Sequence, residues 1–108
     1  MLIHAPRPWS EMQSGTKRYF EENRAVWKAL EEAYKAGSLK TIGVSNFQID
    51  DLQNIMSDCE IKPMANQICI HIGNTPKGLI DFCKEVIMCR RMVCPEFTQF
   101  HSWVECRN

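Results

Sequence analysis

The sequence predicts an α/β fold in which parallel strands are joined by helices, and two observations support this. Short apolar runs alternate with amphipathic stretches up to about residue 87. The strand starts are separated by the lengths typical of right-handed crossover connections. The Gly-x-Gly-x-x-Gly and P-loop signatures are both missing, so the common phosphate-binding turns are not expected. A flavodoxin-like sheet and part of a (β/α)8 barrel both fit this pattern.

The chain opens on a short apolar strand, "MLI", which runs directly into His4. Two prolines and a Ser/Gly/Thr cluster predict that residues 4–22 form a loop without regular structure. A helix is expected over residues 23–37, ending at Gly37 as a C′ glycine would end it. Its expected apolar stripe consists of Ala25, Val26, Ala29, Leu30 and Ala33.

Two further strands continue the alternation. Residues 39–46 contain three β-branched side chains and predict the second strand. A short amphipathic helix follows, with Asp50 and Asp51 in its first turn, where acidic side chains favour the helix dipole. Residues 63–70 predict the third strand.

The last clear element is a helix over residues 75–87, with Thr75 as its N-cap and Pro76 at its first position. Beyond it the periodic pattern breaks. The stretch "MCRRMVC" is compatible with a poor strand, and the rest is expected to be irregular. The chain therefore divides into an α/β segment at residues 1–87 and a divergent, Cys-rich tail at residues 88–108.

The charge balance limits the classes of partner. Lys+Arg 13 and Asp+Glu 13 give a net charge of zero, whereas nucleic acids and anionic membranes select basic surfaces. No apolar run approaches the roughly 20 residues that span a bilayer. The N-terminus lacks the basic leader and apolar segment of a signal peptide. We therefore expect a cytoplasmic protein with no nucleic-acid or membrane partner.

Six cysteines raise the question of disulfides or metal. Without a secretory signal, reduced thiols are the better interpretation, and no Cys-x-x-Cys pair is present. Cys89, Cys94, His101 and Cys106 could form a zinc site, but their spacing is wider than that of usual zinc ligands. We therefore expect no metal site, with a small zinc-binding protein as a less favoured alternative.

Polar residues follow the predicted strands at the end where parallel α/β folds concentrate function. They are His4, the pair Ser45 and Asn46, and the pair Asn66 and Gln67. Each has an ordinary structural explanation, as a hydrogen-bonding histidine or a turn and N-cap. However, adjacent amides on a strand face opposite sides, and one of them must find a polar interior or a ligand. Their common location favours a site.

Four consecutive segments are distinctive: "LIHAPRPW", "VWKALEEAYKAGSLKTIGVSNF", "NQICIH" and "LIDFCK". The second is the most specific, because it joins an amphipathic helix ending in Lys-Ala-Gly to Ile-Gly-Val-Ser-Asn-Phe. Through these segments, about residues 1–85, the chain resembles the aldo-keto reductase family. The resemblance implies part of a (β/α)8 TIM barrel, about three βα units covering strands four to six. It also implies reduction of an aldehyde or ketone with NADPH.

The resemblance further implies roles for individual residues. His4 matches the catalytic histidine that helps to orient and polarise the substrate carbonyl. Ser45 and Asn46 match the pair that hydrogen-bonds the nicotinamide carboxamide, and Gln67 matches a further contact to that group. Holding the carboxamide fixes which ring face delivers the hydride, which is catalysis by orientation.

The departures from the family's pattern are as informative as the matches. The Asp, Tyr and Lys of the family's catalytic tetrad have no counterpart here, and Ala5 replaces the aromatic residue after His4. We therefore expect a truncated aldo-keto reductase that is inactive as an isolated chain. The alternative is a non-catalytic half-barrel module that assembles through its exposed sheet edges, which would favour self-association.

Overall fold

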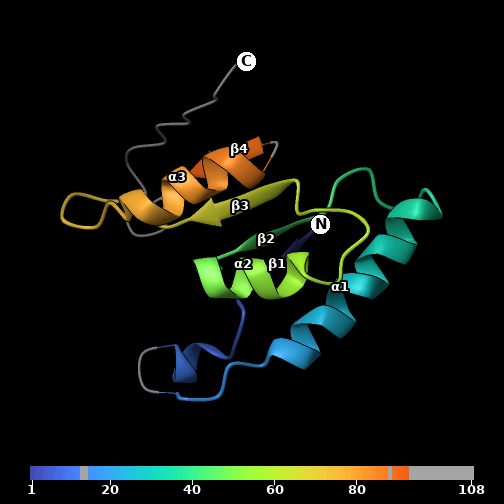
Figure 1. Ribbon diagram of the computed structural model, residues 1–108, viewed down its shortest axis with the longest axis horizontal. Coiled ribbons are helices and arrows are strands. Elements are labelled where there is room, and N and C mark those ends of the chain that lie inside the picture. The colour runs from blue at the N-terminus through green and yellow to red at the C-terminus, as the bar shows by residue number, and fades with distance from the viewer. Residues whose placement is uncertain (13–14, 88, 93–108) are drawn as a thin grey trace.

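The computed structural model describes residues 1–12, 15–87 and 89–92, and its ribbon is shown in Figure 1. Its centre is a sheet in the order β1-β2-β3-β4 with every neighbouring pair parallel. The strands are β1 (Leu2–Ile3), β2 (Gly43–Ser45), β3 (Ala65–Ile68) and β4 (Cys89–Met92). Strand order therefore follows chain order, as expected for successive βα units.

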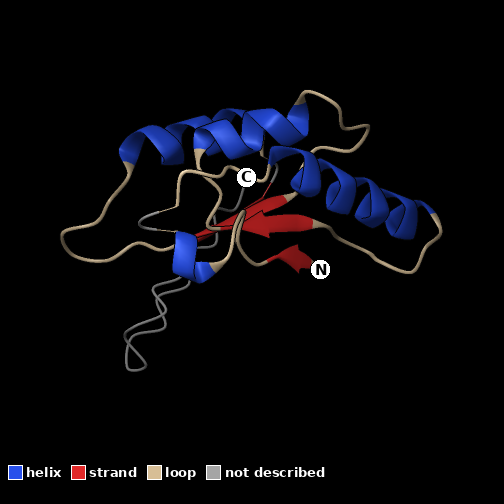
Figure 2. Ribbon diagram, turned by 90° about the horizontal axis from the view of Figure 1, so that it is seen from below, coloured by secondary structure: helices blue, strands red, loops and turns tan. Residues whose placement is uncertain are grey.

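The α-helices lie on one side of this sheet, as Figure 2 shows. They are α1 (Phe20–Lys35), α2 (Ile49–Met56) and α3 (Lys77–Val86), and a single 3-10 turn, η1 (Trp9–Glu11), precedes them. The hydrophobic core lies between the helices and the sheet. Its most buried members are Trp27, Ile42, Val44, Phe47, Leu52 and Ile55. The predicted alternation of strands and helices is confirmed.

Gly43 allows the first three strands to pack closely. A Cβ atom at this position would lie 2.7 Å from both the Ala65 carbonyl oxygen and Leu2 Cδ2. Any larger residue would force β2 away from β3, with which it pairs through Val44 and Ser45. The glycine therefore positions the strand ends.

The first helix differs from the prediction in both its start and its buried face. It begins at Phe20, three residues early, and a 3-10 turn at Trp9–Glu11 interrupts the predicted loop. The buried face consists of Asn23, Trp27, Leu30 and Glu31, whereas Val26 is 49% exposed. The predicted alanine-rich stripe was therefore wrong, apart from Leu30.

Long-range polar contacts explain which face of α1 is buried. Asn23 Nδ2 donates to the Pro6 carbonyl at 2.9 Å, and Trp27 Nε1 donates to the Ile61 carbonyl at 3.0 Å. Glu31 Oε1 accepts hydrogen bonds from the backbone N–H groups of Glu60 and Ile61, both at 2.8 Å. These bonds rotate α1 away from the face that apolar spacing alone favoured.

The helix ends show one confirmed prediction and one error. Gly37 follows α1 with φ +80, the left-handed conformation that glycine adopts most readily, as predicted. At the start of α3 the N-cap is Pro76, and no side chain caps the helix. The prediction of Thr75 as N-cap was therefore wrong. The helix begins at Lys77, leaving Thr75 outside it.

Strand β4 lies within the segment that sequence analysis assigned to the tail. It pairs with β3 from Ala65 opposite Cys89 to Ile68 opposite Met92. Residues 93–108 lie outside the described part of the chain, so the boundary at residue 87 stays a prediction. Three of the four proposed zinc ligands, Cys94, His101 and Cys106, also lie outside it. Among the described residues, no group of three His, Cys, Asp or Glu side chains could hold a metal ion.

The described helices do not include a membrane-spanning segment. None of them combines the length and the apolar character needed to cross a bilayer.

Candidate functional site

The strand ends bring the four candidate residues His4, Ser45, Asn46 and Gln67 together. Asn46 Nδ2 donates to the His4 carbonyl at 3.0 Å, which ties the end of β2 to the end of β1. The Asn46 backbone N–H donates to the Gln67 carbonyl at 3.0 Å, and Ser45 Oγ donates to the same oxygen at 3.2 Å. We call these four residues the strand-end cluster. Three strands contribute to it because parallel strands end at the same edge of a sheet.

Asn46 forms a tight turn between β2 and α2. Its φ of 59 lies in the left-handed region, which Asn tolerates better than most residues with a side chain. This turn directs the Asn46 side-chain amide towards the end of β1, while the Asn46 backbone N–H bonds to the end of β3. The sequence Ser-Asn-Phe therefore acts here as a turn and as part of a polar cluster.

The hydroxyl of Ser45 is buried and already engaged. Ser45 is 3% exposed, and its Oγ accepts a hydrogen bond from Asn46 Nδ2 at 3.1 Å while donating to the Gln67 carbonyl. It therefore fixes the positions of Asn46 and Gln67 in this arrangement, and it exposes little of its own surface to a ligand.

Other groups of the strand-end cluster remain available. Within the described residues, no hydrogen bond engages the side-chain amide of Gln67 or Asn46 Oδ1. The imidazole of His4 is exposed, and its ring edge contacts Trp9 with 5.6 Å between the centroids and 78° between the planes. The cluster thus presents neutral donors and acceptors together with an imidazole.

Sequence reasoning missed Trp9. This residue is 59% exposed and brings an aromatic ring to His4 although Ala5 replaces the aromatic residue expected there. The only signal in the sequence was an aromatic residue a few positions after the histidine. Trp9 lies in a loop whose path the sequence does not predict, so its contact with His4 could not be foreseen.

The two adjacent amides of β3 face opposite sides, as predicted. Gln67 belongs to the strand-end cluster, whereas Asn66 is 2% exposed and faces the helices. Asn66 Nδ2 donates to the Phe47 carbonyl at 3.1 Å and lies 3.6 Å from Cys83 Sγ on α3. Its Oδ1 is buried and has no hydrogen-bond partner among the described residues.

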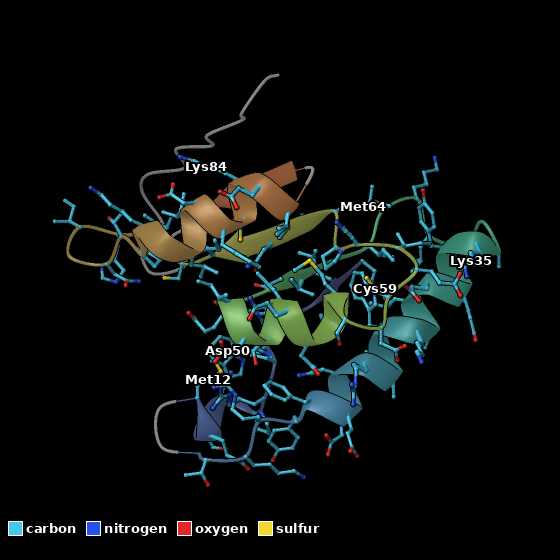
Figure 3. The ribbon with its side chains drawn as sticks, in the orientation of Figure 1. Met12, Lys35, Asp50, Cys59, Met64 and Lys84 are labelled. Carbon is cyan, nitrogen blue, oxygen red and sulfur yellow. The ribbon has the colours of Figure 1, made fainter. Side chains whose placement is uncertain are left out.

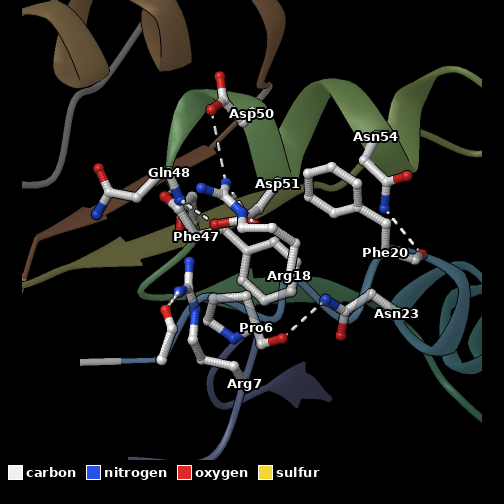
Figure 4. A network of polar contacts seen from close by, with 12 residues as sticks. Pro6, Arg7, Arg18, Phe20, Asn23, Phe47, Gln48, Asp50, Asp51 and Asn54 are labelled. Atoms are coloured by element: carbon white, nitrogen blue, oxygen red, sulfur yellow. Dashed lines mark hydrogen bonds and ion pairs between the residues drawn. The ribbon is translucent and has the colours of Figure 1, made fainter. Parts of the chain in front are cut away.

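A second polar cluster joins the loop before α1 to the start of α2 (Figure 4). Arg18 Nη2 lies 3.2 Å from Asp51 Oδ1 and 3.5 Å from Asp50 Oδ2. Asp51 is fully buried, and its Oδ2 accepts the Gln48 backbone N–H at 3.1 Å, which caps α2. The Arg18 guanidinium also lies over the Phe20 ring, 5.2 Å from its centroid. Every one of these contacts serves the fold.

A polar groove of about 520 Å³ lies between α1 and the loop that follows α2. Figure 3 labels Lys35 and Cys59 on its two sides. Its charges are paired: Lys28 contacts Asp58 at 2.7 Å, and Lys35 contacts Glu60. These lysines lower the pKa of Asp58 and of Glu60, and burial raises the pKa of the Cys59 thiol. The raised pKa leaves Cys59 a poor nucleophile, and both lysines that line the groove are already paired with carboxylates.

Comparisons with known proteins show the family and the fold of the chain. The profile of the Aldo/keto reductase family matches residues 1–91. The chain is 47% identical to a glyoxal reductase of Bacillus subtilis over 83 residues, which are 77% of this chain and 26% of that protein. It is 46% identical to an NADPH-dependent alpha-keto amide reductase of Saccharomyces cerevisiae over 86 residues, 78% of this chain and 26% of the relative. The chain thus spans about a quarter of the length of these relatives.

Solved structures show the same fold. An aldo/keto reductase from Brucella melitensis superposes with a TM-score of 0.70 at 26% identity, covering 84% of this chain and 31% of that one. An aldo-keto reductase of Bombyx mori in complex with NADP gives a TM-score of 0.68 at 27% identity, covering 87% and 30%. The βα units described above are therefore part of a (β/α)8 barrel, and the chain belongs to the aldo/keto reductase family.

Proposed function

We propose that the strand-end cluster is part of the active site of an NADPH-dependent carbonyl reductase. In this site it holds the nicotinamide carboxamide, and its His4 imidazole points towards the substrate carbonyl. The observation that carries this proposal is the meeting of Asn46, Gln67 and His4 at one sheet edge, with open polar groups on all three. The family's use of carbonyl substrates supports it.

The open groups suit a carboxamide. A carboxamide offers two N–H donors and one carbonyl acceptor, and a primary amide side chain can pair with both kinds of group. Gln67 supplies such an amide, and Asn46 Oδ1 supplies an acceptor. Ser45 holds Asn46 and Gln67 in place through its hydrogen bonds to the Asn46 side chain and to the Gln67 carbonyl. Neutral groups suffice because the carboxamide itself has no charge.

NADPH, when bound, supplies the hydride for carbonyl reduction. The residues of this chain orient the reactants: Asn46 and Gln67 hold the carboxamide and so fix the ring face, and His4 donates a hydrogen bond to the carbonyl oxygen. The edge contact with Trp9 limits rotation of the His4 ring. Catalysis at this edge is therefore by positioning and by polarisation of the carbonyl.

Protonation of the carbonyl oxygen needs a positioned acid. Within the described residues, no tyrosine or lysine side chain hydrogen-bonds to His4, and a positioned general acid contributes about 10²–10⁴-fold. We expect that the chain by itself binds the cofactor but reduces simple aldehydes little above background. We also propose the cytoplasm as its location.

A fluorescence titration with NADPH tests the proposal. Saturable binding is expected, and Gln67→Ala should weaken it about tenfold, the equivalent of one hydrogen bond of about 1.4 kcal/mol. Gln53→Ala removes an exposed glutamine from α2 and is the matched control, for which no change is expected. Absence of saturation, or equal effects of the two variants, would contradict the proposal.

One structural feature favours a second function, the assembly of half-barrels. Within the described residues β1 pairs with a strand on one side only, and Met1 and Leu2 beside that edge are 65% and 40% exposed. Unprotected sheet edges promote pairing with another chain. Light scattering after size exclusion tests this: a defined oligomer would support assembly, and a folded monomer would contradict it.

A further inference from the structure

We propose that Asn66 is a positioning residue for the carboxamide-binding turn, acting on Asn46 through the backbone from the opposite side of the sheet. This inference rests on the proposed function for its ligand, and it extends that function to a residue whose side chain does not reach the strand-end cluster. The contacts around Asn46 support it.

Two hydrogen bonds from adjacent β3 residues hold the turn on both sides of Asn46. The Gln67 carbonyl accepts the backbone N–H of Asn46 at 3.0 Å, and Asn66 Nδ2 donates to the carbonyl of Phe47 at 3.1 Å. The first bond fixes the start of the turn and the second fixes the peptide that leaves it. Between them, Asn46 has little freedom to leave the left-handed conformation with φ 59.

Burial makes the second bond difficult to replace. Phe47 is 0% exposed and Asn66 is 2% exposed, so the Phe47 carbonyl has little access to water if Asn66 loses its donor. An unpaired buried carbonyl costs about 1–3 kcal/mol, which a change in the turn could relieve. Relaxation of the turn would move the Asn46 side chain away from the His4 carbonyl that it now contacts at 3.0 Å.

Asn66 itself is retained at a cost. Its Oδ1 is buried without a hydrogen-bond partner among the described residues, although an apolar residue at this place would avoid that loss. The hydrogen bond that the Asn66 side chain makes to the turn therefore comes from its N–H group. A buried amide that satisfies the Phe47 carbonyl while its own oxygen has no partner among the described residues, next to a left-handed residue, is consistent with a role in positioning.

The chain contains a matched control for this bond. Asn54 Nδ2 donates to the Phe20 carbonyl at 3.0 Å, the same donor and the same kind of acceptor, but it joins α2 to the start of α1. Substitutions at Asn54 and Asn66 therefore remove the same kind of hydrogen bond, which is part-buried at Asn54 and buried at Asn66. Only the one at Asn66 is next to the strand-end cluster.

The test compares Asn66→Asp with Asn54→Asp in the full chain, both of which remove the N–H donor at nearly constant volume. NMR of the ligand-free proteins should show shifted backbone and side-chain signals of Asn46 in Asn66→Asp and unchanged ones in Asn54→Asp. Titration with nicotinamide mononucleotide should give binding about tenfold weaker for Asn66→Asp only. Asn66→Ser, which retains a donor, should restore part of the affinity. If the Asn46 signals shifted by the same amount in the Asn66→Asp and Asn54→Asp variants, the proposal would be overturned.

Two features keep the test decisive. Failure of the unmodified chain to bind nicotinamide mononucleotide would contradict the proposed function alone, because the Asn46 signals report positioning without ligand. If the Asn66 variants do not fold, hydrogen exchange measured on the unmodified chain tests the proposal instead. Saturating mononucleotide should slow exchange of the Asn66 side-chain protons and leave those of Asn54 unchanged, and equal protection of the two would count against the proposal.

Discussion

The strand-end cluster and the contacts between α1 and α2 use polar residues in opposite ways. On the helix side, the carboxylates are engaged: buried Glu31 accepts two backbone N–H groups, and buried Asp51 accepts from Arg18 and from Gln48. At the strand ends, the side chains are amides, a hydroxyl and an imidazole, and Gln67 and His4 keep polar groups without hydrogen-bond partners in the described residues. The first region holds the fold together, and the second leaves groups free for a ligand.

Burial and hydrogen bonding distinguish the polar residues of these two regions. Burial with hydrogen bonding identifies Glu31 and Asp51 as structural, because loss of either would leave part-buried backbone N–H groups without their acceptor. His4 is exposed and Gln67 half-buried, and their incomplete hydrogen bonding within the described residues is the basis for proposing them as binding residues. Substitutions on the helix side should therefore change stability, and those at the strand ends should change affinity.

The largest effect on stability is expected from Glu31→Ala. It leaves the backbone N–H groups of Glu60 and Ile61 without their 2.8 Å partner, which should lower the free energy of unfolding by about 3 kcal/mol. Urea unfolding measures this loss. Glu32→Ala, at the exposed neighbouring position, is the control and should change stability by less than about 0.5 kcal/mol. A small loss for Glu31→Ala would remove the contrast between the two regions.

A smaller loss, about 2 kcal/mol, is expected from Asp51→Ala. This variant removes the cap on the Gln48 N–H and the ion pair with Arg18 at a fully buried position. Asp50→Ala removes only a 3.5 Å contact made by a largely exposed carboxylate, and it should have little effect. Thermal unfolding compares the two, and similar melting temperatures would show that Asp51 is less important than its contacts indicate.

Substitutions at Asn46 should lower both the stability of the fold and the affinity for NADPH, and the loss of stability should be the smaller effect. Asn46→Ala should destabilise the fold by about 1 kcal/mol more than Asn46→Gly, since only glycine adopts φ 59 without strain. Both variants remove the side-chain amide and should weaken NADPH binding alike. If Asn46→Gly bound NADPH as tightly as the unmodified chain, the amide would have no part in recognition.

The smallest effect is expected from pH at the polar groove. Lys28 and Lys35 lower the pKa of Asp58 and of Glu60 in the folded chain. The stabilisation is therefore complete above the unfolded carboxyl pKa values of about 4, and it is lost as pH falls through the lowered folded values. Urea midpoints at neutral and acidic pH measure it. Lys28→Met with Lys35→Met should reduce the acid-dependent loss, and an unchanged loss would show that these pairs do not contribute.

The sequence was sufficient to predict the strand-end cluster because the rule behind it is topological. Once the strands are parallel, His4, Asn46 and Gln67 must end at one edge. The buried face of α1 was mispredicted because it depends on partners distant in sequence. The Pro6 and Ile61 backbone groups select Asn23 and Trp27, and periodicity contains no information about them. The contact between Trp9 and His4 was missed for a similar reason, since it depends on the path of a loop.

The most direct test of the central claim is a titration of the isotopically labelled chain with nicotinamide mononucleotide, followed by NMR on side-chain amides. We expect saturable shifts of the Asn46 and Gln67 amide signals together with the His4 imidazole, while Gln53 and Asn54 stay unchanged as internal references. Shifts confined to the groove around Lys28 and Cys59, or no saturable shift at all, would contradict the assignment of the strand-end cluster to the nicotinamide.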